Sequence, residues 1–165
     1  MRTLLLMRHA KSGWEESGLR DHDRPLNARG LDAAPRMGRF LVERGLVPDA
    51  VLSSTATRAR KTAELLAAAA GVPAARVAVL EDLYLASPLG VLDAVARRGG
   101  DAATLLVVAH NPGLEELTGA LARHPVAMPT GTVAAFRLGI DDWTEAMLEM
   151  DAESIGVWRP KELGP

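Results

Sequence analysis

The sequence contains no cysteine in its 165 residues. This absence excludes disulfide bonds, thiolate metal sites and cysteine nucleophiles, and with them the thiol-based phosphatase mechanism. A basic excess is also absent: the formal net charge is −2 and the isoelectric point is about 6.1, which argues against a dedicated nucleic-acid surface. No apolar run approaches the ~20 residues of a membrane span, and the first strand-like run is too short for a signal peptide. We therefore expect a cytoplasmic protein with no nucleic-acid or membrane partner.

Strand-like and helix-like patterns alternate along the chain, and 48% of the residues are apolar. This combination predicts one domain over 1–158, followed by a loosely ordered tail over 159–165. The expected fold is a three-layer α/β/α sandwich with a mainly parallel sheet and a C-terminal antiparallel hairpin. Strands are predicted at 3–7, after Pro48, at 77–80 and at 104–109. Helices are predicted at 28–44, 57–70, 88–97 and from 111–113 onward, and the hairpin at 132–140 and 144–150.

Four segments each end an apolar run with polar residues suited to handling a phosphoryl group. In chain order they deliver Arg8 and His9, then Ser53 and Arg58, then Glu81 and Asp82, and finally His110. Because ligands bind outside the carboxyl ends of parallel strands, we expect these side chains to meet in one pocket.

The chemistry of these side chains indicates phosphoryl transfer. A neutral imidazole such as His9 can attack phosphorus near neutral pH without a separate base. The guanidinium groups of Arg8 and Arg58 match the phosphoryl oxygens and cannot lose their charge. His110 is expected to donate a hydrogen bond to the group in transfer, which requires its cationic form or the correct neutral tautomer.

Five further side chains are candidates with simpler alternatives. Ser53 and Ser54 could cap the following helix and offer donors to an anion, and capping alone is the more ordinary role, above all for Ser54. Asp82, or its neighbour Glu81, is nominated as the general acid only by its position after the third strand. Charged loop residues such as Lys11 could line the mouth of the pocket, although most such residues are simply solvated.

Five linked segments carry a family resemblance: LMRHAKS, DRPLNARG, SSTATRARKTAE, LYLASP and VVAHNPG. In this order, across 4–140, they resemble the histidine phosphatase superfamily, and within it most closely the SixA-type phosphohistidine phosphatases. The resemblance implies a phosphoglycerate mutase-like fold, a nucleophilic His9, phosphate binding by Arg8, Arg58 and His110, and no metal or other cofactor. Asp82 matches the place of the family's acidic residue best.

The resulting prediction is a metal-independent phosphatase that acts through a phosphohistidine intermediate, with a protein phosphohistidine as its substrate. The absence of a long insertion favours an open site and hence a phosphorylated protein as the partner. A phosphomonoesterase or mutase of the same superfamily acting on a small phosphorylated molecule is an alternative, as is a phosphoprotein-binding module without turnover. A metal hydrolase fits least, because the four histidines lack the short spacing of metal-binding motifs.

Overall fold

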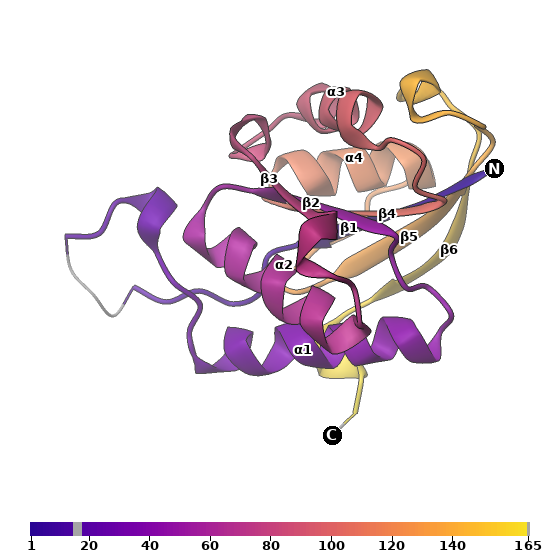
Figure 1. Ribbon diagram of the computed structural model, residues 1–165. Coiled ribbons are helices and arrows are strands. Elements are labelled where there is room, and N and C mark those ends of the chain that lie inside the picture. Colours follow the sequence, from indigo (N-terminus) through magenta and orange to yellow (C-terminus); the bar gives the residue numbers. More distant parts are fainter. Residues whose placement is uncertain (15–17, 165) are drawn as a thin grey trace.

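The computed structural model describes residues 1–14 and 18–164, and its centre is a six-stranded sheet in the order β3-β2-β4-β1-β5-β6 (Figure 1). The strands are β1 (Arg2–Arg8), β2 (Ala50–Ser54), β3 (Val77–Leu80), β4 (Thr104–Ala109), β5 (Val133–Leu138) and β6 (Ala152–Trp158). The first four pair in parallel, whereas β5 is antiparallel to both β1 and β6. The predicted mainly parallel sheet is confirmed.

Two pairs of helices cover the two faces of the sheet, which confirms the three layers (Figure 1). One face carries α1 (Ala28–Glu43) and α2 (Thr57–Ala70), and the other carries α3 (Pro88–Arg98) and α4 (Gly113–Ala122). Each face has its own apolar core, because successive residues of a strand point to opposite sides of the sheet. Leu4 and Leu6 pack toward α3 and α4, while Leu5 and Met7 pack toward α1 and α2.

The topology creates a crevice at one end of the sheet. Strands β1 and β4 are neighbours, with Arg8 paired to Ala109 at their carboxyl ends. The helices that follow them, α1 and α4, leave toward opposite faces. A pair of parallel strands whose connections diverge in this way opens a ligand crevice between their carboxyl ends.

The C-terminal antiparallel pair exists, but its second strand is not the predicted one. Strand β5 pairs with β6, whereas the segment predicted as a strand from 144 to 150 begins in a short 3-10 turn, Trp143–Glu145. The indole of Trp143 is 1% exposed, and its Nε1 donates to the carbonyl of Ala102 at 2.7 Å. Burying this large side chain against α3 keeps the segment out of the sheet, so the connection is longer than a tight hairpin turn.

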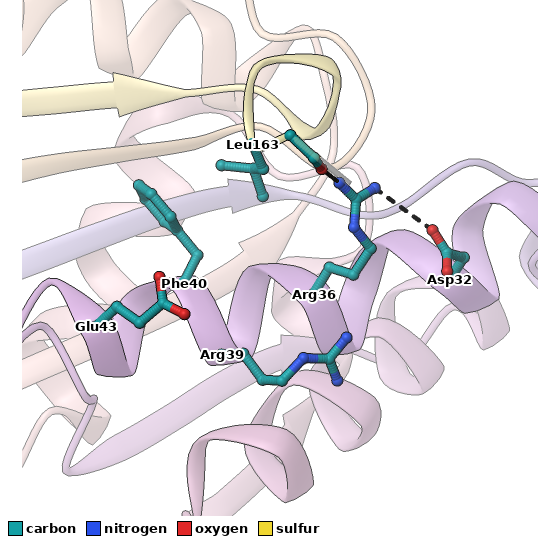
Figure 2. A pocket seen from close by; sticks show the side chains of 7 residues that line it. Asp32, Arg36, Arg39, Phe40, Glu43 and Leu163 are labelled. Atoms are coloured by element: carbon teal, nitrogen blue, oxygen red, sulfur yellow. Dashed lines mark hydrogen bonds and ion pairs between the residues drawn. The ribbon is translucent and has the colours of Figure 1, made fainter.

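The last residues pack against α1 rather than extending freely. Trp158 belongs to β6, and its ring meets Phe40 of α1 edge-on with centroids 5.4 Å apart. The short turn Pro160–Glu162 follows and lies against α1 (Figure 1). In Figure 2, Arg36 reaches from α1 to the carbonyl of Gly164 on one side and to Asp32 on the other. Residues 159–164 therefore form part of the folded surface, and Pro165 lies outside the described residues.

Candidate active site

A cavity of about 610 Å³ opens at the carboxyl ends of β1, β2 and β4. Its walls include four of the side chains singled out from the sequence, namely Arg8, His9, Arg58 and His110. They come from three separate parts of the chain: the end of β1, the first turn of α2 and the end of β4. The side chains of Ser53, Glu81 and Asp82 are not part of the cavity wall.

Two hydrogen bonds fix the tautomer of His9, which is only 5% exposed. Its Nδ1 lies 2.8 Å from the carbonyl oxygen of Ala10, which can only accept, so Nδ1 carries the proton. Its Nε2 accepts from Nε of Arg58 at 3.3 Å. Burial, together with the nearby cations and despite the bond to Ala10, lowers the pKa of His9 to about 3. At neutral pH, His9 therefore presents an uncharged ring with the lone pair of Nε2 facing Arg58.

The loop that carries His9 is held by both helices on its side of the sheet. The Ala10 amide donates to Oγ1 of Thr62 at 3.0 Å, and the same hydroxyl donates to the carbonyl of Arg58 at 2.7 Å. Gly30, in the first turn of α1, approaches this loop so closely that a Cβ there would overlap the carbonyl oxygen of Lys11. The spacing between His9 and Arg58 is thus set by the packing of helices.

Arg58 is 3% exposed, and its guanidinium is held on several sides. Nη1 donates to the main-chain carbonyl of Asp21 at 2.6 Å, and Nη2 donates to Oδ2 of Asp21 at 3.0 Å. Nη2 also lies 3.4 Å from Nδ1 of His110. These contacts direct Nε of Arg58 at His9 and Nη2 at His110.

Asp21 is a site residue that the sequence analysis did not single out. It lies in a short 3-10 turn, Asp21–Asp23. The hydroxyl of Tyr84 donates to Oδ2 of Asp21 at 2.6 Å. The bonds from Tyr84 and then from Arg58 lower the pKa of Asp21 to about 2, so this carboxylate is ionised at neutral pH. Among the described residues it is the only carboxylate in the cavity wall. No periodicity or motif spacing could have linked it to Tyr84, 63 positions away.

His110 is 2% exposed and is bonded through both ring nitrogens. Its Nδ1 faces Nη2 of Arg58, which can only donate, so Nδ1 accepts and Nε2 carries the proton. Nε2 lies 2.7 Å from Oγ of Ser54, which also accepts from the amide of Ala56 at 3.1 Å. Burial, followed by the charge of Arg58, lowers the pKa of His110 to about 4. Ser54 thus positions His110 and does not cap α2 as expected, because the N-cap residue of that helix is Ala56 and no side chain caps it.

Arg8 adds a second guanidinium to the cavity. Its Nη1 donates to the carbonyl of Met128 at 3.3 Å, while its buried Nε has no hydrogen-bond partner among the described residues. No group in the described part of the chain therefore uses this donor. The guanidinium groups of Arg8 and Arg58 and the two neutral imidazoles are a set of side chains suited to an oxyanion.

The structure does not bring Ser53 or Asp82 to this cavity, which corrects both predictions of position. Ser53 is wholly buried, and its hydroxyl donates to the carbonyl of Ser54 at 2.9 Å. Alternate residues of a strand face opposite sides, so only Ser54 of this pair reaches His110. Asp82 is exposed and pairs with Arg97 at 2.9 Å. It lies in the short turn Glu81–Leu83, where the side chain that turns inward is Leu83.

The described residues contain neither a metal-binding cluster nor a helix that could span a membrane. Across residues 1–14 and 18–164, no three or more histidine, aspartate or glutamate side chains are gathered so that they could hold a metal ion. In the same part of the chain, no helix has the length and apolar character needed to cross a membrane.

Comparison with known proteins places this geometry in a family. A family model described as the histidine phosphatase superfamily (branch 1) matches residues 4–87. An uncharacterised protein of Mycobacterium tuberculosis (strain ATCC 25618 / H37Rv) is 46% identical over 117 residues, which cover 70% of this chain and 70% of that protein. The family model spans the segments that contribute Arg8, His9 and Arg58.

Two solved structures described provisionally as the phosphohistidine phosphatase SixA have the same fold. One, from Nakamurella multipartitia, is 34% identical with a TM-score of 0.77 and covers 96% of each chain. The other, from Agrobacterium tumefaciens, is 26% identical with a TM-score of 0.78 and covers 96% of this chain and 98% of that one. The expected phosphoglycerate mutase-like fold is therefore confirmed, and the chain belongs to the histidine phosphatase superfamily.

Proposed function

We propose that this protein is a metal-independent phosphatase that transfers a phosphoryl group to Nε2 of His9 and then to water, and that its substrate is a phosphohistidine on another protein. The observation that carries the proposal is the state of His9, which is buried, uncharged at neutral pH and protonated on Nδ1. Such a ring offers its Nε2 lone pair to phosphorus without first losing a proton.

The first half of the reaction forms one bond and breaks another. The lone pair of His9 Nε2 attacks phosphorus while the bond from phosphorus to the leaving group breaks, and the leaving group keeps that electron pair. The Nε–H of Arg58, which donates to this lone pair before substrate binds, passes to a phosphoryl oxygen as the new bond forms, while the guanidinium keeps its bonds to Asp21. The guanidinium of Arg8, which lines the same cavity, binds a second oxygen. In the second half, water attacks phosphorus, the bond to Nε2 breaks, and the lone pair returns to His9 as phosphate leaves.

His110 supports the transfer once the phosphoryl group is bound. Its Nδ1 accepts from Arg58 in the structure, so it has no N–H to give in that tautomer. A phosphoryl dianion beside the ring raises the pKa of His110, because a nearby negative charge favours the cation. The protonated ring then donates from Nδ1 while Nε2 keeps its bond to Ser54.

The proton donors of the cavity favour a nitrogen leaving group. Asp21 is the only carboxylate in the described part of the wall, and its pKa of about 2 leaves no proton to give at neutral pH. An alkyl phosphate must expel an alkoxide, for which a positioned acid contributes roughly 10²- to 10⁴-fold. A phosphohistidine ring can take a proton from water, since an unperturbed imidazole has a pKa of about 6.5. The substrate thereby supplies the acid that the described part of this wall lacks.

The test is a substrate panel with a phosphohistidine peptide, a phosphoserine peptide of the same sequence and a small sugar phosphate. We expect kcat/KM for the phosphohistidine peptide to exceed the other two by roughly 10²-fold or more, the range that a missing acid contributes. Preference for the sugar phosphate would favour the small-molecule phosphatase or mutase. Tight binding of the phosphohistidine peptide without any release of phosphate would favour a binding module.

A further inference from the structure

A second hollow adjoins the catalytic cavity and shares three residues with it. This groove, of about 530 Å³, runs from Arg8, Lys11 and Thr130 along the first half of α1 to the C-terminal segment 159–162. Figure 1 shows that segment lying beside α1, and Figure 2 shows Arg36 tying the end of the chain to the same helix. The groove is thus built on segments that pack against α1, and it adjoins the catalytic cavity.

The groove is strongly cationic. Its wall carries two carboxylates, and both are already paired: Asp32 with Arg36 at 3.4 Å and Glu162 with Arg159 at 3.5 Å. Four other cations in the wall form no ion pair with any described residue: Arg8, which is assigned to the phosphoryl group, and Lys11, Arg29 and Lys161. The chain as a whole has a formal net charge of −2, so this positive surface is a local feature. A groove with unpaired charge of one sign attracts ligands of the other.

The arrangement of the last three cations suits an extended ligand better than a compact one. Lys11 comes from the loop after β1, Arg29 from the first turn of α1 and Lys161 from the C-terminal segment, and all three are exposed. A second phosphate of a small substrate would need buried donors that converge on one point. Exposed cations from three separate segments instead match carboxylates spaced along a chain.

We propose that this groove, built on Lys11, Arg29 and Lys161, binds an acidic segment of the phosphorylated partner protein next to its phosphohistidine. The inference rests on the proposed function, because it places the phosphoryl group in the cavity that contains His9. The groove then selects among phosphohistidine proteins by the charge of the neighbouring sequence, and the chemistry in the cavity is the same for all of them.

The test compares two phosphohistidine peptides that differ only in their flanking residues, which are aspartate and glutamate in one and asparagine and glutamine in the other. Binding is measured by fluorescence anisotropy on His9→Ala protein, and kcat/KM is measured on protein that retains His9. At low ionic strength we expect the acidic peptide to be favoured about tenfold in both measurements, as three exposed ion pairs allow. The preference should decline as salt is added.

The variant Arg29→Gln/Lys161→Gln should reduce this preference to about twofold, since it removes two of the three pairs. The matched control is Lys61→Gln/Arg76→Gln, which removes two exposed cations that lie outside both hollows and form no ion pair with described residues. The control should keep the full preference. Because the readout is a ratio between two peptides, a general loss of activity cancels.

Equal binding and turnover of the two peptides would overturn the groove proposal, and so would a preference that survives in the Arg29→Gln/Lys161→Gln variant. A third arm adds inorganic pyrophosphate as a competitor. If the Arg29→Gln/Lys161→Gln substitutions weaken the binding of pyrophosphate more than the binding of the acidic peptide, the groove is a second phosphate subsite and the proposal is wrong. Preference in binding without hydrolysis of either peptide would refute the proposed function alone. Hydrolysis without preference would refute the groove alone.

Discussion

Arg58 donates twice to Asp21, once to its main-chain carbonyl at 2.6 Å and once to its carboxylate at 3.0 Å. The two residues are 37 positions apart, and the carboxylate carries a second bond from Tyr84. An almost fully buried guanidinium is therefore oriented before any phosphoryl group arrives. Preorganised charge of this kind contributes more to catalysis than charge that must reorient during the reaction.

Asp21 is accordingly predicted to position Arg58 rather than to transfer a proton. Asp21→Ala should lower kcat/KM about 10²-fold and Asp21→Asn less than tenfold, because asparagine keeps an acceptor for Arg58 although it loses the charge. Steady-state kinetics and vanadate inhibition on both variants provide the measurement, with Tyr84→Phe as a milder control. Equal and large losses in Asp21→Ala and Asp21→Asn would instead point to a direct role for the carboxylate.

His9 is predicted to carry the phosphoryl group between the two halves of the reaction. Rapid quenching with a labelled substrate should trap a phosphoenzyme that is labile in acid and stable in base, as expected for a phosphorylated imidazole. His9→Ala should lack this species and lose at least about 10⁴-fold in kcat, which is the scale for loss of a nucleophile. Circular dichroism confirms that the variant folds. Substantial turnover by folded His9→Ala protein would exclude the assignment.

The buried histidines predict a loss of stability in mild acid. The pKa values of His9 and His110 fall from 6.5 to about 3 and about 4, so the unfolded chain binds protons first as the pH drops. Their contribution to stability is complete above pH 6.5 and is lost progressively from there down to about pH 3. Urea unfolding across this range should show a falling midpoint, and His9→Ala should fall less steeply. Parallel slopes would mean that His9 ionises normally.

Asp82 is now predicted to be dispensable. Its carboxylate is exposed and paired with Arg97, and an exposed ion pair contributes only about 0 to 1 kcal/mol. Asp82→Asn should therefore leave kcat/KM within about twofold for both phosphohistidine and alkyl phosphate substrates, with Arg97→Gln as its matched control. A selective loss on alkyl phosphates would restore the general acid role that the sequence suggested.

Metal independence is the remaining prediction. Turnover should persist in EDTA, because binding and charge stabilisation are assigned to Arg8, Arg58 and His110. Vanadate should inhibit at low concentration, since it occupies the same donors as a transferring phosphoryl group. Activity that disappears in EDTA and returns with a divalent ion would contradict the mechanism.

The sequence predicts those parts of the fold and of the site that depend only on local residue patterns and on the order of the strands. The apolar runs before His9 and His110 predicted buried strands of a parallel sheet, whose carboxyl ends lie at one edge, and the structure shows that the two strands are neighbours. Motif order then identified Arg58. Other features depend on packing that no local pattern records. The register of β2 decides that Ser54 rather than Ser53 faces His110, and burial of Trp143 decides where the last strand begins.

The carboxylate of the site shows even more clearly that a local sequence pattern does not predict packing between distant segments. Position after a strand nominated Asp82, yet the inward turn of Leu83 leaves that carboxylate in solvent. Asp21 reaches the cavity because its turn folds back onto Arg58 and Tyr84, a contact between distant segments. Such contacts follow from the assembled fold, and a single sequence gives no measure of them.

The hydroxyl of Thr62 links the backbone beside His9 to the backbone of Arg58. Any shift of α2 is therefore passed to the nucleophile, and the two halves of the reaction centre move as one rigid unit. A centre of this kind cannot discriminate between substrates by tightening around the right one. Selection among substrates with the same leaving group is left to the surfaces outside it, so new partner proteins can be acquired through changes at the rim with the interior unaltered.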